Sequence, residues 1–147
     1  MILLVEPDQV KQCWDLINVT IERSYPTVQE HLKTGLLYDL LLGTAQVWVI
    51  THGDKQTLNN AEGMFITRIS ESFSTGGRAL TVLAACAFTG ANDEMFLSSF
   101  NALKEYGLAR DCQVVDFFTN NDAIMNYVKG LSILWECKYV QLNLKES

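Results

Sequence analysis

The sequence predicts a single α/β domain built on a mixed sheet (a mixed α+β arrangement), and three observations support this. Its 147 residues match the usual length of one domain. Apolar residues make up 48% of the chain and charged residues 19%, which permits a packed core and excludes disordered and collagen-like chains. Helical periodicity alternates with β-rich runs in the order β-α-α-β-β-β-α-β-α-β. No linker or repeat interrupts this order, so we expect one domain over residues 1–147.

The N-terminal third is predicted to form one strand and two helices. The apolar run 2–5 ends at Pro7, which suits a short strand. Asp8 is expected to cap the first helix and Gly43 to end the second. Apolar residues recur at helical spacing in both: Val10, Trp14, Ile17 and Ile21 in the first, and Val28, Leu32, Leu36 and Leu40 in the second.

The remainder of the chain predicts a three-strand meander, a crossover helix, and then a strand, a short helix and a last strand. The expected meander strands cover residues 46–51, 63–69 and 78–88, joined by a loop at 52–62 and a turn at 72–77. The third of these is apolar on both faces, as in a central strand covered on both sides. The later strands are placed at 113–119 and 136–144, and the unit over 78–119 should be a right-handed parallel crossover.

Charge and cysteine content exclude several classes of function. The net charge is −6 and no basic cluster occurs, which disfavours a nucleic-acid partner. The four cysteines form no CxxC pair, so we expect no metal site but buried, reduced thiols in a cytosolic setting. The longest apolar stretch is about half of what a membrane-spanning helix needs, so no membrane association is expected.

One C-terminal stretch resembles a known family. Residues 120–131, Asn-Asn-Asp-Ala-Ile-Met-Asn-Tyr-Val-Lys-Gly-Leu, are similar to the N-x-x-A-x-x-x-Y-x-K-x-G-F stretch of the GCN5-related N-acetyltransferase (GNAT) superfamily, one residue shorter. The predicted order of elements is also similar to that family along the whole chain, and the N-terminal half resembles short phage-encoded proteins of this fold. The resemblance implies that Asn120 contacts coenzyme A and that Tyr127 protonates the leaving thiolate.

Each of these residues also has a structural explanation. Asn120 suits a helix cap, and Tyr127 suits an aromatic side chain on an amphipathic helix. The resemblance places Gly90 and Ala91 in the cofactor loop, and Glu71 is the candidate general base, although a strand end explains it equally well. His52 and Asp116 are further polar candidates that suit a loop and an outward-facing strand position.

The expected cofactor loop departs from the family pattern. Acetyltransferases of this family carry Q/R-x-x-G-x-G/A between the central strand and the next helix, where bare N–H groups hold the coenzyme A pyrophosphate. Here this stretch has one glycine and no Arg or Gln, and Asp93 and Glu94 fall in the first helical turn. At ~5 Å and an effective dielectric of ~20, each carboxylate would repel a phosphate charge by roughly 3 kcal/mol before screening. The sequence therefore predicts that the pyrophosphate site is lost.

Two function classes follow from these observations. The first is a GNAT-fold protein without acyl-CoA catalysis and without a cofactor. It would act as a binding or structural component with a protein partner, phage-encoded and located in the host cytoplasm or the virion. The alternative is an active N-acetyltransferase that uses acetyl-CoA. The stretch from Asn120 to Tyr127 supports this alternative. A small-ligand sensor is a third class without a specific motif, and homo-oligomerisation is left open.

Overall fold

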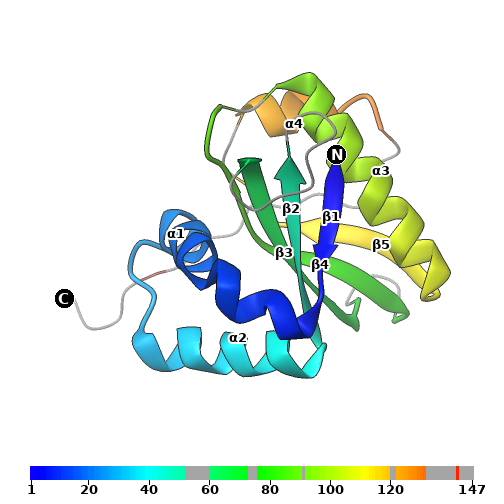
Figure 1. The fold of residues 1–147 in the computed structure, drawn as a ribbon. Helices are drawn as coiled ribbons and strands as arrows, with labels where there is room; N and C mark the ends of the chain where they lie inside the picture. The colour runs from blue at the N-terminus through cyan, green and yellow to red at the C-terminus, as the bar shows by residue number, and fades with distance from the viewer. Residues whose placement is uncertain (52–59, 73–75, 91, 120–121, 132–141, 143–147) are drawn as a thin grey trace. The chain divides into compact units, whose positions relative to one another are not determined.

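A five-stranded mixed sheet organises the fold (Figure 1), and it confirms the predicted α/β class. The strands are β1 (Ile2–Val5), β2 (Ala45–Thr51), β3 (Ala61–Glu71), β4 (Arg78–Ala87) and β5 (Cys112–Phe117). They lie side by side in chain order, with β1 to β4 antiparallel and β5 parallel to β4. The predicted meander and the parallel crossover are therefore both present.

The computed structural model describes residues 1–51, 60–72, 76–90, 92–119, 122–131 and 142. Most of the loop predicted at 52–62 and nearly all of the strand predicted at 136–144 lie outside these residues. The chain divides into two compact units, Met1–Phe117 and Phe118–Ser147. The second unit holds the helix α4 (Asp122–Val128), where a short helix was predicted. The prediction of one domain over 1–147 stays a prediction.

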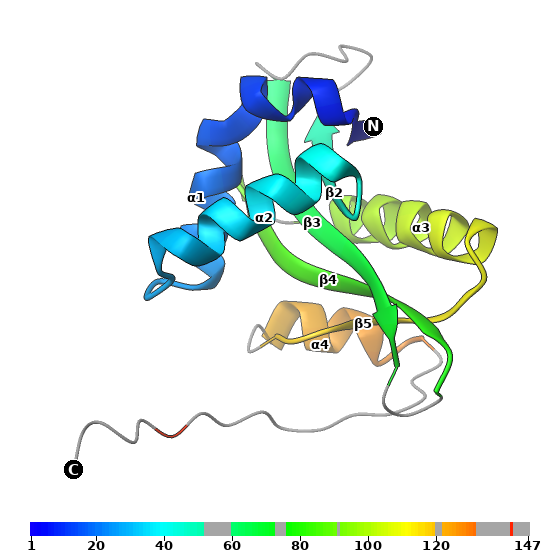
Figure 2. The ribbon, with the colours of Figure 1, turned by 90° about the horizontal axis from the view of Figure 1, so that it is seen from below.

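Helices cover both faces of the sheet (Figure 2). A 3-10 segment η1 (Pro7–Cys13), α1 (Trp14–Ser24) and α2 (Glu30–Leu42) pack on one face, and α3 (Asp93–Ala109) packs on the other. Alternation along β2 sends its side chains to two cores: Val47 and Val49 to the helix pair, and Trp48 and Ile50 to the α3 side. The whole of β2 is therefore buried.

The structure corrects the start of the first helix. Asp8 is not its cap, because the helical segment already begins at Pro7 and its first two turns are 3-10. A 3-10 helix repeats every three residues, and the two buried side chains of this segment, Val10 and Cys13, are three residues apart. The α-helix proper begins at Trp14.

The second helix also differs from its predicted face. Leu32, expected to point inward, is 57% exposed, whereas Leu40 is buried as predicted. Lys33, the residue after Leu32, is buried instead, and its ammonium forms ion pairs with Glu22 on α1 and with Glu30. Periodicity alone favours leucine inside, but the two carboxylates make the lysine ammonium acceptable there.

Several strand ends lie one or two residues from their predicted positions. Ala61 and Glu62, predicted as loop, belong to β3, which is eleven residues long. The strand β5 ends at Phe117, two residues before the predicted end. The strand β4 is central but not covered throughout, and Ala85 is exposed, because β4 continues after β5 has ended.

Candidate functional site

The candidate site is the place where β4 and β5 part. Their parallel pairing begins at the pair Arg78–Cys112 and ends at the pair Val82–Phe117. The strand β4 continues to Ala87 while still paired with β3 on its other side. From Leu83 onward β4 therefore has no paired strand on its β5 side within the described part of the chain.

A β-bulge marks the beginning of this open edge. Ile66 of β3 pairs with Ala84, and the next residue, Thr67, pairs with Val82, so Leu83 is an extra residue on β4. A bulge locally strengthens the twist of a strand and re-aims its backbone groups, and bulges are over-represented beside functional sites. This one lies directly after the last β4–β5 pair.

The C-terminal end of α1 contacts this open edge. Ser24 Oγ accepts a hydrogen bond from the Ala85 N–H and donates one to the Ala85 carbonyl, both at 3.3 Å. The Tyr25 hydroxyl donates to the Leu83 carbonyl. One residue earlier, Arg23 donates to Cys86 Sγ at 3.3 Å. Three consecutive residues thus engage the strand edge.

The segment from β4 to α3 forms the other side of the site. Gly90 has φ +99°, a left-handed conformation that favours glycine, and it is exposed. The Asn92 side chain accepts the Met95 N–H at 2.9 Å and caps α3. Asp93 and Glu94 follow in the first turn, and both are exposed. The carboxylates suit the helix dipole by themselves.

The start of α3 and the open edge of β4 are both occupied in part by groups of this chain. At the start of α3 the N–H of Met95 is already bonded to Asn92, and two carboxylates stand where a pyrophosphate would need positive charge. Lys104 on the same helix is eleven residues from Asp93, which is about 16 Å along the axis. At the edge of β4, Ser24 Oγ is hydrogen-bonded to both the N–H and the carbonyl of Ala85.

The predicted site residues do not all meet at this place. Gly90 belongs to it, whereas Ala91 and Asn120 lie outside the described residues. Glu71 is exposed and pairs with Arg78, the first residue of the ten-residue β4, about 30 Å along the strand from Ala87, which precedes the Gly90 turn.

Tyr127 lies in α4, in the unit Phe118–Ser147, where it is half-buried and its carbonyl accepts the Gly130 N–H at 3.3 Å. Its predicted role as a proton donor stays a prediction, as do the predicted roles of Glu71 and Asn120. Asp116 is exposed on β5, opposite Thr81, and His52 lies outside the described residues.

Sequence reasoning missed Arg23, Ser24 and Tyr25. The polar stretch before Pro26 was recognised only as a helix break. The partners of these residues on β4 are about sixty positions away along the chain, and no spacing rule connects such distant segments. The only hint in the sequence was that two residues with hydroxyl groups, Ser24 and Tyr25, stand together at the end of an amphipathic helix.

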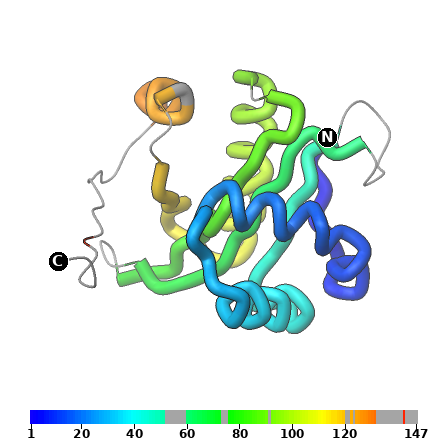
Figure 3. Tube along the Cα trace, turned by 90° about the vertical axis from the view of Figure 1, so that its left-hand side faces the viewer, coloured from blue at the N-terminus to red at the C-terminus, as the bar shows by residue number. Residues whose placement is uncertain are grey.

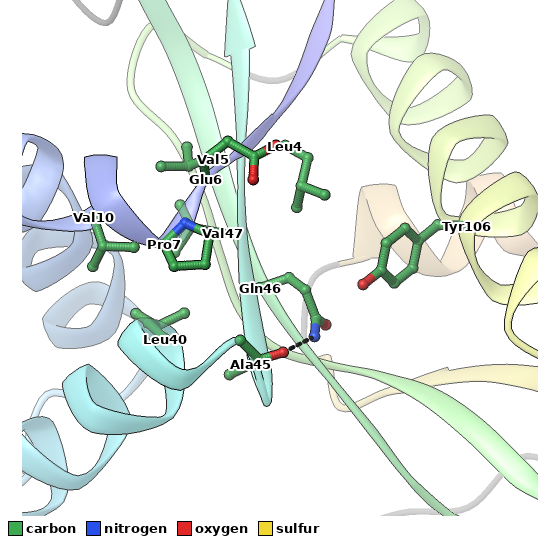
Figure 4. A pocket seen from close by; sticks show the side chains of 11 residues that line it. Leu4, Val5, Glu6, Pro7, Val10, Leu40, Ala45, Gln46, Val47 and Tyr106 are labelled. Atoms are coloured by element: carbon green, nitrogen blue, oxygen red, sulfur yellow. Dashed lines mark hydrogen bonds between the residues drawn. The ribbon is translucent and has the colours of Figure 1, made fainter.

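A small cavity lies elsewhere, at the end of β1 (Figure 4). It measures about 110 Å³, and its wall includes Pro7, Leu40 and Tyr106. Pockets for small-molecule ligands usually measure several hundred Å³, so this one is too small for a cofactor. Burial raises the pKa of Tyr106, and the Arg110 guanidinium lies 3.4 Å above its ring centre.

Metal and membrane sites receive no support from the described residues. No three His, Cys, Asp or Glu side chains in that part of the chain are grouped to hold a metal ion. Cys13 and Cys112 are buried as expected, while Cys86 is only partly so. Among the helices of the described residues, none has the length and apolarity to span a bilayer.

Comparison with solved structures identifies the fold. A probable acetyltransferase superposes with a TM-score of 0.70 at 11% identity, over 100% of this chain and 98% of the other. A predicted acetyltransferase from Clostridium acetobutylicum, solved with acetyl-CoA, gives 0.69 at 10% identity over 100% and 97%. This chain has the GNAT fold. An aminoglycoside acetyltransferase from an uncultured soil metagenomic sample, solved with sisomicin, gives 0.68 at 11% identity over 97% and 93%.

The GNAT fold is all that these similarities show, because identities of 10–11% carry no statement about the site. No protein-family model and no curated protein matches the sequence. The GNAT resemblance stated from residues 120–131 is thus confirmed for the fold. Function has to be argued from the residues at the open edge of β4 and at the start of α3.

Proposed function

We propose that this GNAT-fold protein does not transfer acyl groups from coenzyme A and acts as a binding component for a protein partner. The observation that carries the proposal is the start of α3, where Asp93 and Glu94 occupy the first turn. In an anion site at a helix start, free N–H groups and positive charge hold the phosphates. This helix start offers carboxylates instead.

The electrostatic cost supports the proposal quantitatively. A pyrophosphate within ~5 Å of either carboxylate would meet a repulsion of roughly 3 kcal/mol per charge pair before salt screening. The Asn92 cap removes one N–H from the available donors, because Met95 N is bonded to it. The attraction of the helix dipole, about 0.3–1 kcal/mol, is too small to offset both effects.

An active N-acetyltransferase is the second candidate, and one observation favours it. In a GNAT fold with β4 and β5 parted after Val82 and Phe117, an extended ligand could lie against β4 once the edge is free. One of the similar structures was solved with acetyl-CoA. For this candidate to hold, Ser24 would have to release Ala85, and acetyl-CoA would have to bind despite the carboxylates of Asp93 and Glu94.

A thermal-shift titration of the full chain with acetyl-CoA tests the proposal. We expect no change in Tm up to millimolar ligand. Saturation at ~100 times Kd would add about 2.7 kcal/mol of stability and raise Tm by roughly 5–11 °C. Such a rise, together with acetyl transfer to an amine in a coupled assay, would establish the enzyme instead.

A charge-removal variant tests the stated cause. Asp93→Asn with Glu94→Gln keeps the shape of both side chains but removes their charges, so acetyl-CoA affinity should rise at least tenfold over the wild type. Glu105→Gln, an exposed carboxylate in the C-terminal half of α3, is the matched control and should change nothing. An equal affinity in all three proteins would contradict the electrostatic explanation.

The remaining expectations stay predictions from the sequence. A phage source and a place in the virion or host cytoplasm rest on the family resemblance alone. The absence of a nucleic-acid partner rests on the net charge of −6, and homo-oligomerisation stays open.

A further inference from the structure

We propose that the outer edge of β1 and the cavity at its end bind an extended, basic segment of the protein partner, which places one branched aliphatic side chain in the cavity. The inference rests on the proposed function and deepens it, since it names the surface and the kind of partner. The surface belongs to the unit Met1–Phe117. Figure 3 shows β1, in dark blue, beside β2 at the end of the sheet, and β5 forms the opposite edge.

The backbone of β1 presents hydrogen-bonding groups on its outer side. The Met1 ammonium donates to the Thr51 carbonyl at 3.0 Å, and the Thr51 N–H donates back to the Met1 carbonyl at 2.9 Å. In an antiparallel ladder, residues bonded to the neighbour in this way alternate with residues whose N–H and C=O point away from it. By the register of β1 with β2, the groups of Ile2 and Leu4 therefore point outward. Among the described residues, no strand pairs with them there.

The cavity provides a place for one side chain beside this edge. It begins where β1 ends, with Leu4 and Val5 in its wall. Figure 4 shows Val10 and Leu40 on one side of it and Tyr106 on the other, so both cores contribute to the wall. An apolar cavity of about 150 Å³ admits benzene. At about 110 Å³, this cavity suits the side chain of a valine, leucine or isoleucine better than an aromatic ring.

The wall of the cavity is held in place and can be reached from outside. The Tyr106 ring meets Trp48 edge-on, with 4.8 Å between the ring centres, and the Arg110 guanidinium lies 3.4 Å from the Tyr106 ring centre. A preformed wall lowers the ordering cost of binding. Leu4 is 37% exposed although it lines the cavity, so a segment from solvent can reach it.

Edge and cavity together match a known way of binding peptides. An extended segment that adds to a sheet edge gains affinity from backbone hydrogen bonds, and a pocket for one of its side chains gives specificity. The outward groups of Ile2 and Leu4 offer the hydrogen bonds, and the cavity directly follows them along the chain. An extended segment with an aliphatic side chain is therefore the ligand that uses both.

Charge favours a basic segment over a second copy of this chain. The net charge is −6, and the exposed residues Glu6 and Asp8 directly follow β1. A cationic segment is attracted to this surface, whereas two copies, each with a net charge of −6, repel each other. Since β1 has only four residues, pairing of two β1 strands would also bury little surface.

A synthetic peptide, acetyl-Lys-Thr-Lys-Leu-Lys-Thr-Lys-amide, tests the inference on the full-length chain. An NMR titration up to millimolar peptide should shift the amide signals of Ile2 and Leu4 in a saturable way and slow their hydrogen exchange. Replacing the leucine of the peptide by alanine should weaken binding roughly fivefold or more, because the aliphatic side chain is no longer buried. Replacing its lysines by glutamates should weaken binding by at least as much.

The edge is tested by comparing Ile2→Pro with Ile2→Ala. Both variants lose the isoleucine side chain, but only proline lacks the outward N–H, which the ladder with β2 does not use. Ile2→Pro should bind the peptide at least fivefold more weakly than Ile2→Ala. If Ile2→Pro does not fold, wild-type protein is titrated with peptides that are N-methylated at alternate residues, in either phase. One phase should then bind at least fivefold more weakly than the other.

The cavity is tested by Ala45→Val, which adds two methyl groups to its wall. This variant should weaken binding of the leucine peptide but not of the alanine peptide. Ala61→Val, a strand alanine outside the cavity wall, is the matched control and should change neither.

Three results would overturn the inference. They are unshifted Ile2 and Leu4 signals, equal affinity for the leucine and alanine peptides, and a dimer in sedimentation analysis that Ile2→Pro dissociates, which would place a second copy at this edge. Each of them leaves the proposed function in place. Acetyl transfer from acetyl-CoA by the wild type, measured without peptide, overturns the proposed function instead.

Discussion

At the scale of single residues, Lys33 shows how a charge is held inside this fold. Its side chain is 9% exposed, and its ammonium lies 2.6 Å from a Glu22 oxygen and 3.2 Å from a Glu30 oxygen. The hydrogen bond to Glu22 is the main reason that the pKa of Lys33 is raised, and burial opposes it. The lysine therefore keeps its charge because both carboxylates face it.

The first prediction concerns the pH dependence that follows. A raised pKa means that this pairing stabilises the fold fully below the ordinary lysine value of about 10.4 and is lost as pH rises through the higher folded value. The difference in unfolding free energy between the wild type and Lys33→Met should therefore shrink above about pH 10. Urea unfolding from pH 7 to 11 measures it, with Lys104→Met, an exposed lysine on α3, as the control. A difference that does not fall with rising pH would contradict the pairing.

The second prediction concerns the cap of α3. Replacing Asn92 by alanine leaves the Met95 N–H without its side-chain acceptor and should lower the unfolding free energy by about 1 kcal/mol. Asn101→Ala, at an exposed position within the same helix, should change stability by less than about 0.5 kcal/mol. Thermal denaturation of both variants decides it. Equal effects would mean that the cap contributes nothing.

At the scale of elements, α2 shows where pattern rules succeed and where they fail. Its C-terminal end was predicted from Gly43, which has φ +80° and caps the helix through bonds of its N–H to the last carbonyls. Its inward face was predicted only in part, because leucines surround the whole helix and Leu32 points outward. When leucines occur on every face of a helix, their spacing does not indicate which face points to the core.

The third prediction compares two glycines of this element. Gly43→Ala should lower the unfolding free energy by about 1 kcal/mol, because alanine is strained at this positive φ although nothing lies within 4 Å of its Cβ. Gly35→Ala, inside the same helix and also in open space, should raise it by about 0.5–1 kcal/mol. Chemical denaturation measures both. The same sign for both substitutions would show that packing, not backbone conformation, decides.

At the scale of the unit Met1–Phe117, one sheet joins two cores. Ile66 is fully buried on the side of α1 and α2, and Leu80 is fully buried on the side of α3. Since the two cores share the same strands, disruption of one removes support from the other. The two sides should therefore lose structure together.

The fourth prediction follows from this coupling. Ile66→Ala and Leu80→Ala should each lower the unfolding free energy by about 2–5 kcal/mol through the cavities they leave. Urea transitions followed by far-UV circular dichroism and by tryptophan fluorescence should coincide in both variants. Trp14 packs on one core and Trp48 on the other, so the fluorescence reports on both. Separate transitions would contradict a shared core.

Part of the candidate site was predictable and part was not. Gly90, Asp93 and Glu94 could be placed from sequence, because a β-rich run, a turn and a helix start are local patterns. Ser24 and Tyr25 could not be assigned to the edge of β4. Their partners are set by the packing of α1 on the sheet and by the point where β5 ends.

The sequence by itself determined the α/β class, the order of the described elements and the acidic start of α3, because periodicity, turn residues and charge act over short stretches of chain. Only the tertiary structure decided that β4 continues beyond its last pair with β5 at Val82, that Leu83 forms a bulge and that Ser24 is hydrogen-bonded to Ala85. These features depend on strand register and on contacts between residues about sixty positions apart. Register is fixed by how the side chains of all strands fill the two cores together.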